Sequence, residues 1–82
     1  MRVTVLYFAI LRERLGREDE TLDLPPGADV RTARAEIAAR HPEAAPLLPR
    51  VATAVNRAMV SETHLLADED ELALIPPVAG GW

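Results

Sequence analysis

The sequence predicts an α+β fold in which one main helix packs across one face of a small mixed sheet. Apolar and polar residues alternate near the start of the chain, as in a strand, and a short apolar run at residues 72–75 predicts a strand near its end. Residues 30–40 carry an apolar stripe at helical spacing. Segments that contain proline or glycine separate these patterns, and the chain has no internal repeat or linker. At 82 residues it has room for a single domain.

The first strand is predicted over about residues 2–8. Val3 and Val5 alternate with polar neighbours, which indicates a strand covered on one face. The apolar run at residues 6–9 would then fill both faces, as in a strand that passes into the interior. We therefore expect this strand to be among the most buried of the sheet.

A short helix and a second strand follow. Leu11 and Leu15 lie four residues apart, and Gly16 stands where a helix commonly ends, so one or two helical turns are predicted. Residues 20–24 alternate again before the turn sequence Pro-Pro-Gly at 25–27. The opening third therefore predicts a β-hairpin with a helical elaboration in its loop.

The main helix is predicted to run from Asp29, its N-cap, to about Arg40. Its apolar stripe at i, i+3, i+7 and i+8 consists of Val30, Ala33, Ile37 and Ala38. The exposed side is predicted to carry Arg31, Arg34 and Glu36. His41 precedes Pro42, and the residue before proline disfavours the α region, so the helix should end there.

Short elements are predicted for the second half. Three prolines within residues 42–49 leave room only for a short turn of helix. Residues 51–55 and 59–60 predict short strands around Asn56-Arg57, and residues 72–75 predict a last strand halted by two prolines.

One long helix across such a sheet is the β-grasp arrangement of ubiquitin-like domains. In that arrangement the first and last strands lie side by side in the sheet centre, which would explain why their apolar runs are the strongest in the chain. We predict a β-grasp domain over residues 1–75 and an extended C-terminal tail over residues 76–82.

Composition excludes several classes of function. The net charge is −4, which argues against nucleic-acid binding. The chain has no cysteine for disulfides or thiolate metal sites, and no lysine to accept an isopeptide bond. The N-terminal apolar run has no signal-peptide cleavage site, and no run approaches the ~18–20 residues that span a bilayer. We expect a cytoplasmic protein that binds no membrane.

The end of the chain is the candidate reactive site. Two prolines begin the segment 76–81 and restrict it, and two glycines end it with a backbone narrow enough for a channel. Extended at ~3.3 Å per residue, this segment reaches ~20 Å, enough to enter a buried site while the domain stays outside. Trp82 follows Gly81, so the carboxyl group of Gly81 is not free in this sequence.

Several stretches match one family. They are Leu6-Tyr7-Phe8-Ala9, Leu11-Arg12-Glu13, Leu15-Gly16, Ala54-Val55-Asn56, Val60, Leu66, Asp68, Asp70-Glu71-Leu72-Ala73 and Ile75-Pro76-Pro77-Val78-Ala79-Gly80-Gly81. On these stretches the sequence resembles the molybdopterin synthase small subunit, a MoaD-type ubiquitin-like sulfur carrier. The match is spread over most of the chain.

The resemblance implies a carrier in molybdenum cofactor biosynthesis that is not itself an enzyme. After loss of Trp82, an E1-like adenylating enzyme would use ATP to adenylate the carboxylate of Gly81, and a sulfur donor would convert it to a thiocarboxylate. The large subunit of molybdopterin synthase would accept the tail and use the sulfur for dithiolene formation. The inserted tail would comprise Pro76, Pro77, Val78, Ala79, Gly80 and Gly81. No cofactor or metal is expected on this chain.

A partner surface is predicted beside the tail. A sheet exposed on one side would leave an apolar patch, and its candidates are Leu6, Phe8, Ile75 and Val78. Core packing is favoured for Leu6 and Phe8, and it is the less favoured alternative for Ile75 and Val78. Arg12 could pair with an acidic group of the activating enzyme, and a plain solvated arginine is the equal alternative.

Other polar groups are interpreted as structural. For Asp68-Glu69-Asp70-Glu71 a solvated turn is favoured over a docking patch or a cation site. The family commonly has glycine where this chain has Glu69, so we expect a turn type that needs no positive φ. Surface or capping roles are expected for His41 and His64, and turn roles for Ser61 and Thr63.

Two functional alternatives remain open from the sequence. One is a sulfur carrier for thiamine synthesis, tRNA thiolation or cysteine synthesis. The other is a ubiquitin-like protein modifier or binding module without sulfur transfer.

Overall fold

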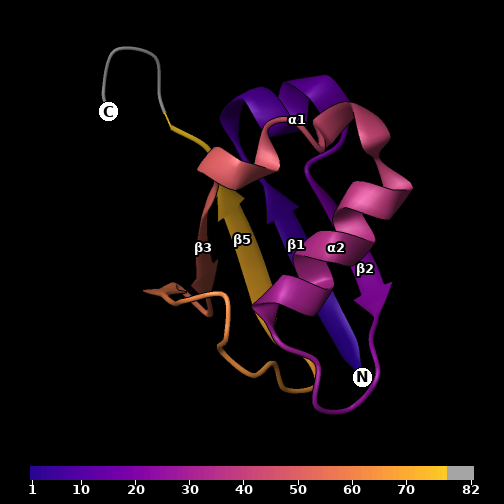
Figure 1. Ribbon diagram of the computed structural model, residues 1–82, viewed down its shortest axis with the longest axis vertical. Helices are drawn as coiled ribbons and strands as arrows, with labels where there is room; N and C mark the ends of the chain where they lie inside the picture. The colour runs from indigo at the N-terminus through magenta and orange to yellow at the C-terminus, as the bar shows by residue number, and fades with distance from the viewer. Residues whose placement is uncertain (78–82) are drawn as a thin grey trace.

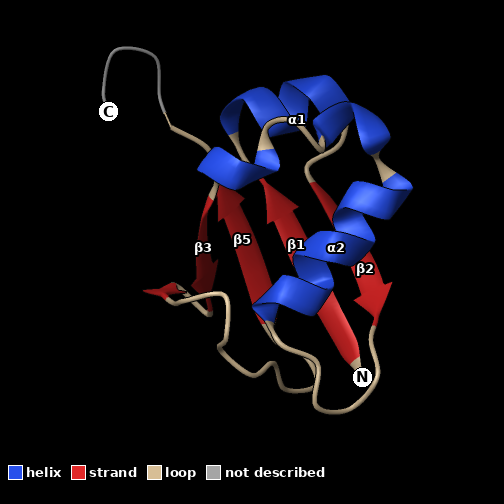
Figure 2. Cartoon of the chain, viewed as in Figure 1, coloured by secondary structure: helices blue, strands red, loops and turns tan. Residues whose placement is uncertain are grey.

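The computed structural model describes residues 1–77, which form a five-stranded mixed sheet crossed on one face by the main helix (Figures 1 and 2). In chain order the elements are β1 (Arg2–Tyr7), α1 (Ala9–Leu15), β2 (Asp19–Asp23), α2 (Val30–Arg40), the 3₁₀ turns η1 (Pro42–Ala44) and η2 (Leu48–Arg50), β3 (Ala52–Val55), β4 (Ala58–Met59) and β5 (Glu71–Ile75). The strand order is β2-β1-β5-β3-β4. This arrangement confirms the predicted β-grasp fold.

The two terminal strands lie side by side in the sheet centre, as predicted. β1 and β5 pair in parallel, with Val5 opposite Leu72 and Tyr7 opposite Leu74. The other pairs, β1 with β2, β3 with β5 and β3 with β4, are antiparallel. Because β1 and β5 run in the same direction, both end at the same edge of the domain (Figure 1).

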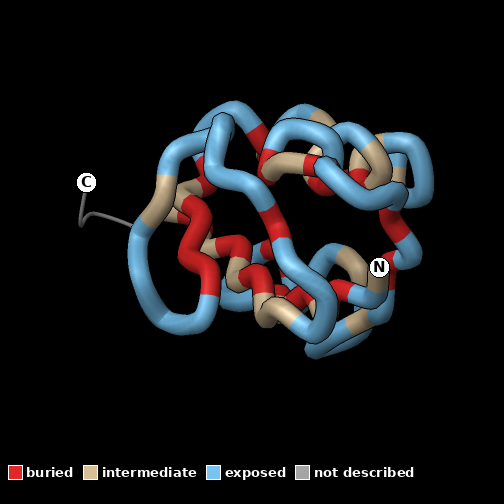
Figure 3. The backbone as a smooth tube through the Cα atoms, turned by 90° about the horizontal axis from the view of Figure 1, so that it is seen from below, coloured by how far each residue is buried: buried red, intermediate tan, exposed pale blue. Residues whose placement is uncertain are grey.

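The core fills the space between the sheet and α2, and the buried stretches of chain run through the middle of the molecule (Figure 3). Its largest fully buried side chains are Tyr7, Leu11, Leu22, Ile37, Leu72, Leu74, Val3, Val5 and Val30. Every second residue of β1 and β5 therefore faces α2, as strand geometry requires.

The helix α2 begins and ends as predicted. The Asp29 side chain accepts hydrogen bonds from the backbone N–H and the hydroxyl of Thr32, both at 2.9 Å. His41 is the C-cap residue, and its N–H donates to the carbonyl of Ile37. None of the helices within residues 1–77 has the length and apolar character needed to cross a membrane.

The predicted exposure of Arg34 is wrong. Its side chain is only 13% exposed and reaches from α2 to η2. There its guanidinium group donates to the carbonyl of Val51 at 3.0 Å and to the carbonyl of Leu48. A long side chain can bury its stem while its charged end satisfies the carbonyl groups of a helical turn, and helical periodicity does not report this reach.

The first strand ends earlier than predicted. β1 stops at Tyr7, Phe8 is the N-cap of α1, and Ala9 has a φ of 50°. The expectation that residues 6–9 enter the interior on both faces is therefore wrong, because the chain leaves the sheet at Phe8 and only Tyr7 of this run is buried. The predicted end of α1 is confirmed: Gly16 has a φ of 67° and donates its N–H to Arg12.

The turn before β5 also differs from the prediction. Glu69 has a φ of 69°, so a positive φ is required there after all. The N–H of Glu69 donates to the carbonyl of Arg2 at 2.7 Å, and the N–H of Asp70 donates to Ala67 at 3.1 Å. The N–H of Arg2 in turn donates to Asp68 at 2.7 Å. These bonds tie the turn to β1 and hold Glu69 in the left-handed region.

Candidate functional site

The sheet face opposite α2 carries an apolar patch. On this face the strand register places Leu6 opposite Ala73, Ala73 opposite Ala54, and Ala54 opposite Met59. We call it the open-face patch, and it consists of Leu6, Phe8, Ala52, Ala54, Met59, Ala73 and Ile75. Phe8 is 40% exposed and Met59 65% exposed, so large apolar side chains meet solvent here.

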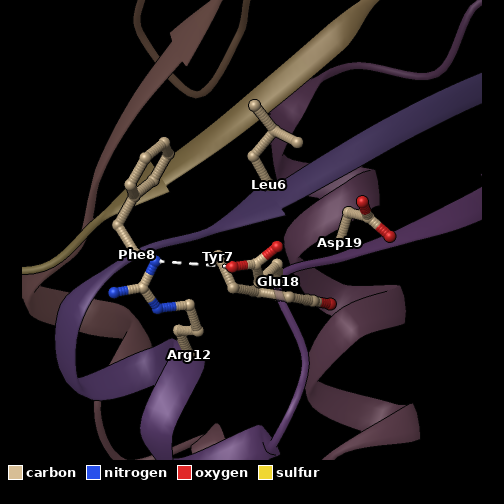
Figure 4. Close-up of a pocket in the computed structure, with 6 residues that line it drawn as sticks. All are labelled: Leu6, Tyr7, Phe8, Arg12, Glu18 and Asp19. Carbon is tan, nitrogen blue, oxygen red and sulfur yellow. Dashed lines mark ion pairs between the residues drawn. The ribbon is translucent and has the colours of Figure 1, made fainter.

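An open hollow of about 240 Å³ borders this patch where β1 passes into α1. It is lined by Leu6, Tyr7, Phe8, Arg12, Glu18 and Asp19, and Leu6 and Phe8 project from the chain toward the same side (Figure 4). Arg12 and Glu18 form an ion pair at 3.8 Å across the hollow, with side chains 52% and 80% exposed. An exposed pair of this kind contributes little to stability, so Arg12 is available to another carboxylate.

The base of the tail lies at the same end of the sheet. Ile75 ends β5 opposite Ala52, and Pro76 is buried while Pro77 is half-buried. Tyr7, the last residue of β1, lies opposite Leu74, the last but one residue of β5. The chain therefore leaves both strands at this end of the sheet. The structure thus brings Leu6 and Phe8 together with Ile75 and the start of the tail. The other predicted site residues, Val78, Ala79, Gly80, Gly81 and Trp82, lie outside the described residues.

The acidic turn has intramolecular roles. Asp70 accepts hydrogen bonds from the Asn56 side chain at 2.9 Å and from the N–H of Ala67 at 2.7 Å. Within residues 1–77 no group of three or more His, Cys, Asp or Glu side chains is placed to hold a metal ion. Ser61 and Thr63 bond to each other through their hydroxyl groups at 3.0 Å on the surface.

A cluster of charges surrounds Glu20, and the sequence patterns did not predict it. The carboxylate of Glu20 is only 7% exposed, and one of its oxygens lies 2.5 Å from the hydroxyl of Tyr7 and 2.7 Å from Nε2 of His41. The other oxygen lies 3.3 Å from Arg17 and 3.6 Å from Arg40. One signal could have revealed it: Glu20 shares its strand face with Leu22 and Leu24, which belong to the core.

The cluster shifts two ionisation equilibria. Burial, then the hydrogen bond to Glu20 and its charge, raise the pKa of Tyr7 far above the usual value. Burial alone would raise the pKa of Glu20. Hydrogen bonds from Tyr7 and His41 and the charged groups beside the carboxylate outweigh burial and lower it. Glu20 is therefore ionised in the folded protein at neutral pH, while Tyr7 stays a hydrogen-bond donor.

A helix across a five-stranded sheet with parallel central strands, and an apolar open face beside the C-terminal exit, define a ubiquitin-like β-grasp domain. Comparison with protein families gives the more specific assignment. Residues 5–81 match the ThiS family, and the chain belongs to that family. The match extends through Gly81, so it includes the tail that carries the two glycines.

Curated relatives and solved structures agree with this assignment. The chain is 37% identical to the molybdopterin synthase sulfur carrier subunit of Chlamydomonas reinhardtii, over 99% of this chain and 100% of the relative. It is similar to a putative molybdopterin converting factor subunit 1 from Pyrococcus furiosus, with a TM-score of 0.87 and 35% identity over 95% of this chain and 99% of that one.

Two further structures are informative. SAMP1 from Haloferax volcanii has a TM-score of 0.89 and 26% identity, over 99% of this chain and 100% of that one. A chain in the complex of subunits 1 and 2 of the molybdopterin-converting factor from Helicobacter pylori has a TM-score of 0.74 and 27% identity. The match covers 99% of this chain and 100% of that one.

Proposed function

We propose that this chain is the sulfur carrier subunit of a molybdopterin synthase and carries a thiocarboxylate on Gly81. The observation that carries the proposal is the position of the tail base: Ile75 and the buried Pro76 adjoin the apolar surface formed by Leu6 and Phe8. A partner that covers this surface would receive the tail directly. The names of the full-length relatives support the same function.

The chemistry needs no catalytic side chain from this protein. Hydrolysis of the Gly81–Trp82 peptide bond first frees the carboxylate, which is ionised at neutral pH and resists nucleophilic attack. The carboxylate then attacks the α-phosphate of ATP on an activating enzyme and releases pyrophosphate. A sulfur donor supplies hydrosulfide, which displaces AMP and, after losing its proton, leaves the thiocarboxylate. The carrier supplies the reactive group, and its partners supply the catalysis.

The open-face patch is proposed as the docking surface for the large synthase subunit. Phe8 is the largest side chain of the patch and is partly exposed, which is typical of a residue that anchors an interface. Arg12 lies beside it across the hollow and would pair with an acidic group of the activating enzyme. We propose that Val78, the next residue of the tail, contacts the same partner.

Mass spectrometry tests the sulfur chemistry. Two proteins, one ending at Gly81 and one at Trp82, are incubated with a cognate activating enzyme, ATP and a sulfide source. We expect only the protein that ends at Gly81 to form the adenylate and to gain the mass of one oxygen replaced by sulfur. Absence of both products from the shorter protein would overturn the proposal.

Binding to a cognate large subunit tests the docking surface. We expect Phe8→Ser to weaken binding by a factor on the order of ten or more, because it removes an apolar anchor of the interface. Leu65→Ser is the matched control, since Leu65 is 67% exposed and lies outside the patch. Equal affinities for the two variants would argue against docking through this face.

A protein modifier is the second candidate function, and the similarity to SAMP1, whose name stands for small archaeal modifier protein 1, favours it. In that case cells would contain adducts in which Gly81 forms an isopeptide bond with lysines of other proteins. Such adducts would survive denaturation and reduction, whereas a thiocarboxylate would appear only on the free carrier. Affinity purification from the native cells followed by peptide mapping distinguishes the two products.

A further inference from the structure

The strand β2 forms the longer of the two sheet edges. Its partner on the inner side is β1, and the opposite edge, β4, is only two residues long. The N–H of Tyr7 donates to the carbonyl of Glu18, and the N–H of Leu24 donates to the carbonyl of Met1, both at 2.8 Å. These two bonds show which residues of β2 direct their backbone groups toward β1. By alternation, the backbone groups of Asp19, Thr21 and Asp23 point outward from the sheet.

Two guanidinium groups cover this outer edge. Nε of Arg17 donates to the carbonyl of Asp19 at 3.1 Å, and Nη1 of Arg40 donates to the carbonyl of Thr21 at 3.4 Å. Arg17 comes from the loop before β2, whereas Arg40 reaches over from the last turn of α2. Two of the three outward carbonyl groups of β2, those of Asp19 and Thr21, are therefore occupied, and charged side chains stand in the path of another strand.

The buried carboxylate of Glu20 pairs with both arginines, and Arg40 is also held by Glu36, whose carboxylate lies 2.9 Å from its Nε. One oxygen of Glu20 faces Arg17 and Arg40, and the other is fixed by Tyr7 and His41. The carboxylate is thus oriented from the protein interior and pairs with the two arginines at the surface. This arrangement explains why a charged residue occupies a core-facing position of β2.

We propose that Arg17 and Arg40, anchored on Glu20, form an edge guard that prevents β2 from pairing with β2 of a second copy of this chain. Without the guard, two copies could join antiparallel about a two-fold axis and extend the sheet across both. The guard concerns the sheet edge, so it is independent of the sulfur chemistry proposed for the tail.

Self-association of the double variant R17A/R40A tests the edge guard. We expect its dimer association constant, measured by sedimentation equilibrium, to rise about tenfold or more over that of the unaltered protein. The matched control is R14A/R50A, because Arg14 and Arg50 are exposed and make no ion pair within residues 1–77. Both variants change the net charge from −4 to −6, so the control has the same added repulsion.

A third variant identifies the surface that associates. The outward N–H of Thr21 makes no bond to β1, so adding Thr21→Pro to R17A/R40A removes an edge donor and leaves the inner ladder in place. We expect this triple variant to return to the monomer. The single variant R40A, which leaves Arg17 on Glu20, should associate to an intermediate extent. A monomeric R17A/R40A with native circular dichroism, or association that persists in the triple variant, would overturn the proposal.

Discussion

Glu69 holds a backbone conformation that side chains other than glycine adopt at a cost, with a φ of 69° in the turn before β5. The left-handed region costs an L-residue roughly 1–2 kcal/mol, and glycine avoids this cost but loses more entropy on folding. We expect Glu69→Gly to raise the free energy of unfolding by about 0.5–1 kcal/mol. Urea denaturation measures the change.

Glu69→Ala is the control for this prediction, because it removes the same side chain and keeps the strain. We expect its stability to lie within about 0.5 kcal/mol of the unaltered protein. If alanine stabilised the protein as much as glycine, relief of charge repulsion in the acidic turn would be the cause instead.

Glu20 makes stability depend on pH. Its pKa in the folded protein is lower than the ordinary value of 4.5, so the unfolded chain takes up a proton at a pH where the folded protein does not. The stabilisation is present above pH 4.5 and is lost as the pH falls through the lowered folded pKa. We expect Glu20→Gln to make the acid loss of stability shallower, as followed by urea denaturation at several pH values.

Glu18→Gln is the matched control for Glu20→Gln, since the Glu18 side chain is 80% exposed. In this pH range, the free energy of unfolding of Glu18→Gln should change with pH as steeply as that of the unaltered protein. If the free energy of unfolding of Glu20→Gln fell with decreasing pH as steeply as that of the unaltered protein, other carboxylates would dominate the loss of stability in acid.

At the scale of elements, the sequence predicted the boundaries that depend on a few neighbouring residues. Asp29, Gly16 and the prolines at 25–26 and 42 act within a few residues of their own position, and the boundaries that they predicted are confirmed. The Arg34 contact with η2 and the contacts of Glu20 with Tyr7 and His41 join segments 13 to 21 residues apart, so periodicity could not reveal them. For the candidate site, alternation along β1 placed Leu6, but the exit of the chain at Phe8 depended on tertiary structure.

The contact between Arg34 and η2 gives an element-scale prediction. Arg34 is the side chain that ties α2 to the carbonyl groups before β3. We expect Arg34→Ala to lower the free energy of unfolding by roughly 1–3 kcal/mol, because hydrogen bonds from a charged donor are lost. Arg31→Ala on the same helix is the control, since that side chain is 69% exposed, and it should change stability by less than about 0.5 kcal/mol. Equal losses for both would contradict the assignment.

The whole molecule has little stability in reserve. A core in a chain of 82 residues supplies only ~3–5 kcal/mol of net stability. Leu72 is fully buried in the central strand β5, so we expect Leu72→Ala to cost about 2–5 kcal/mol and to leave a large unfolded fraction at 25 °C. Circular dichroism during thermal unfolding measures this loss. Leu65→Ala, at an exposed leucine, should unfold like the unaltered protein.

The parallel pairing of β1 and β5 also determines how the domain responds to mechanical force. The tail continues from β5, which is hydrogen-bonded to β1 on one side and to β3 on the other. A pull on the tail acts along the strand, so the bonds of both ladders bear the load together in shear instead of opening one at a time. If a partner draws the tail into a channel, as proposed above, the two ladders would resist the pull together and keep the domain folded.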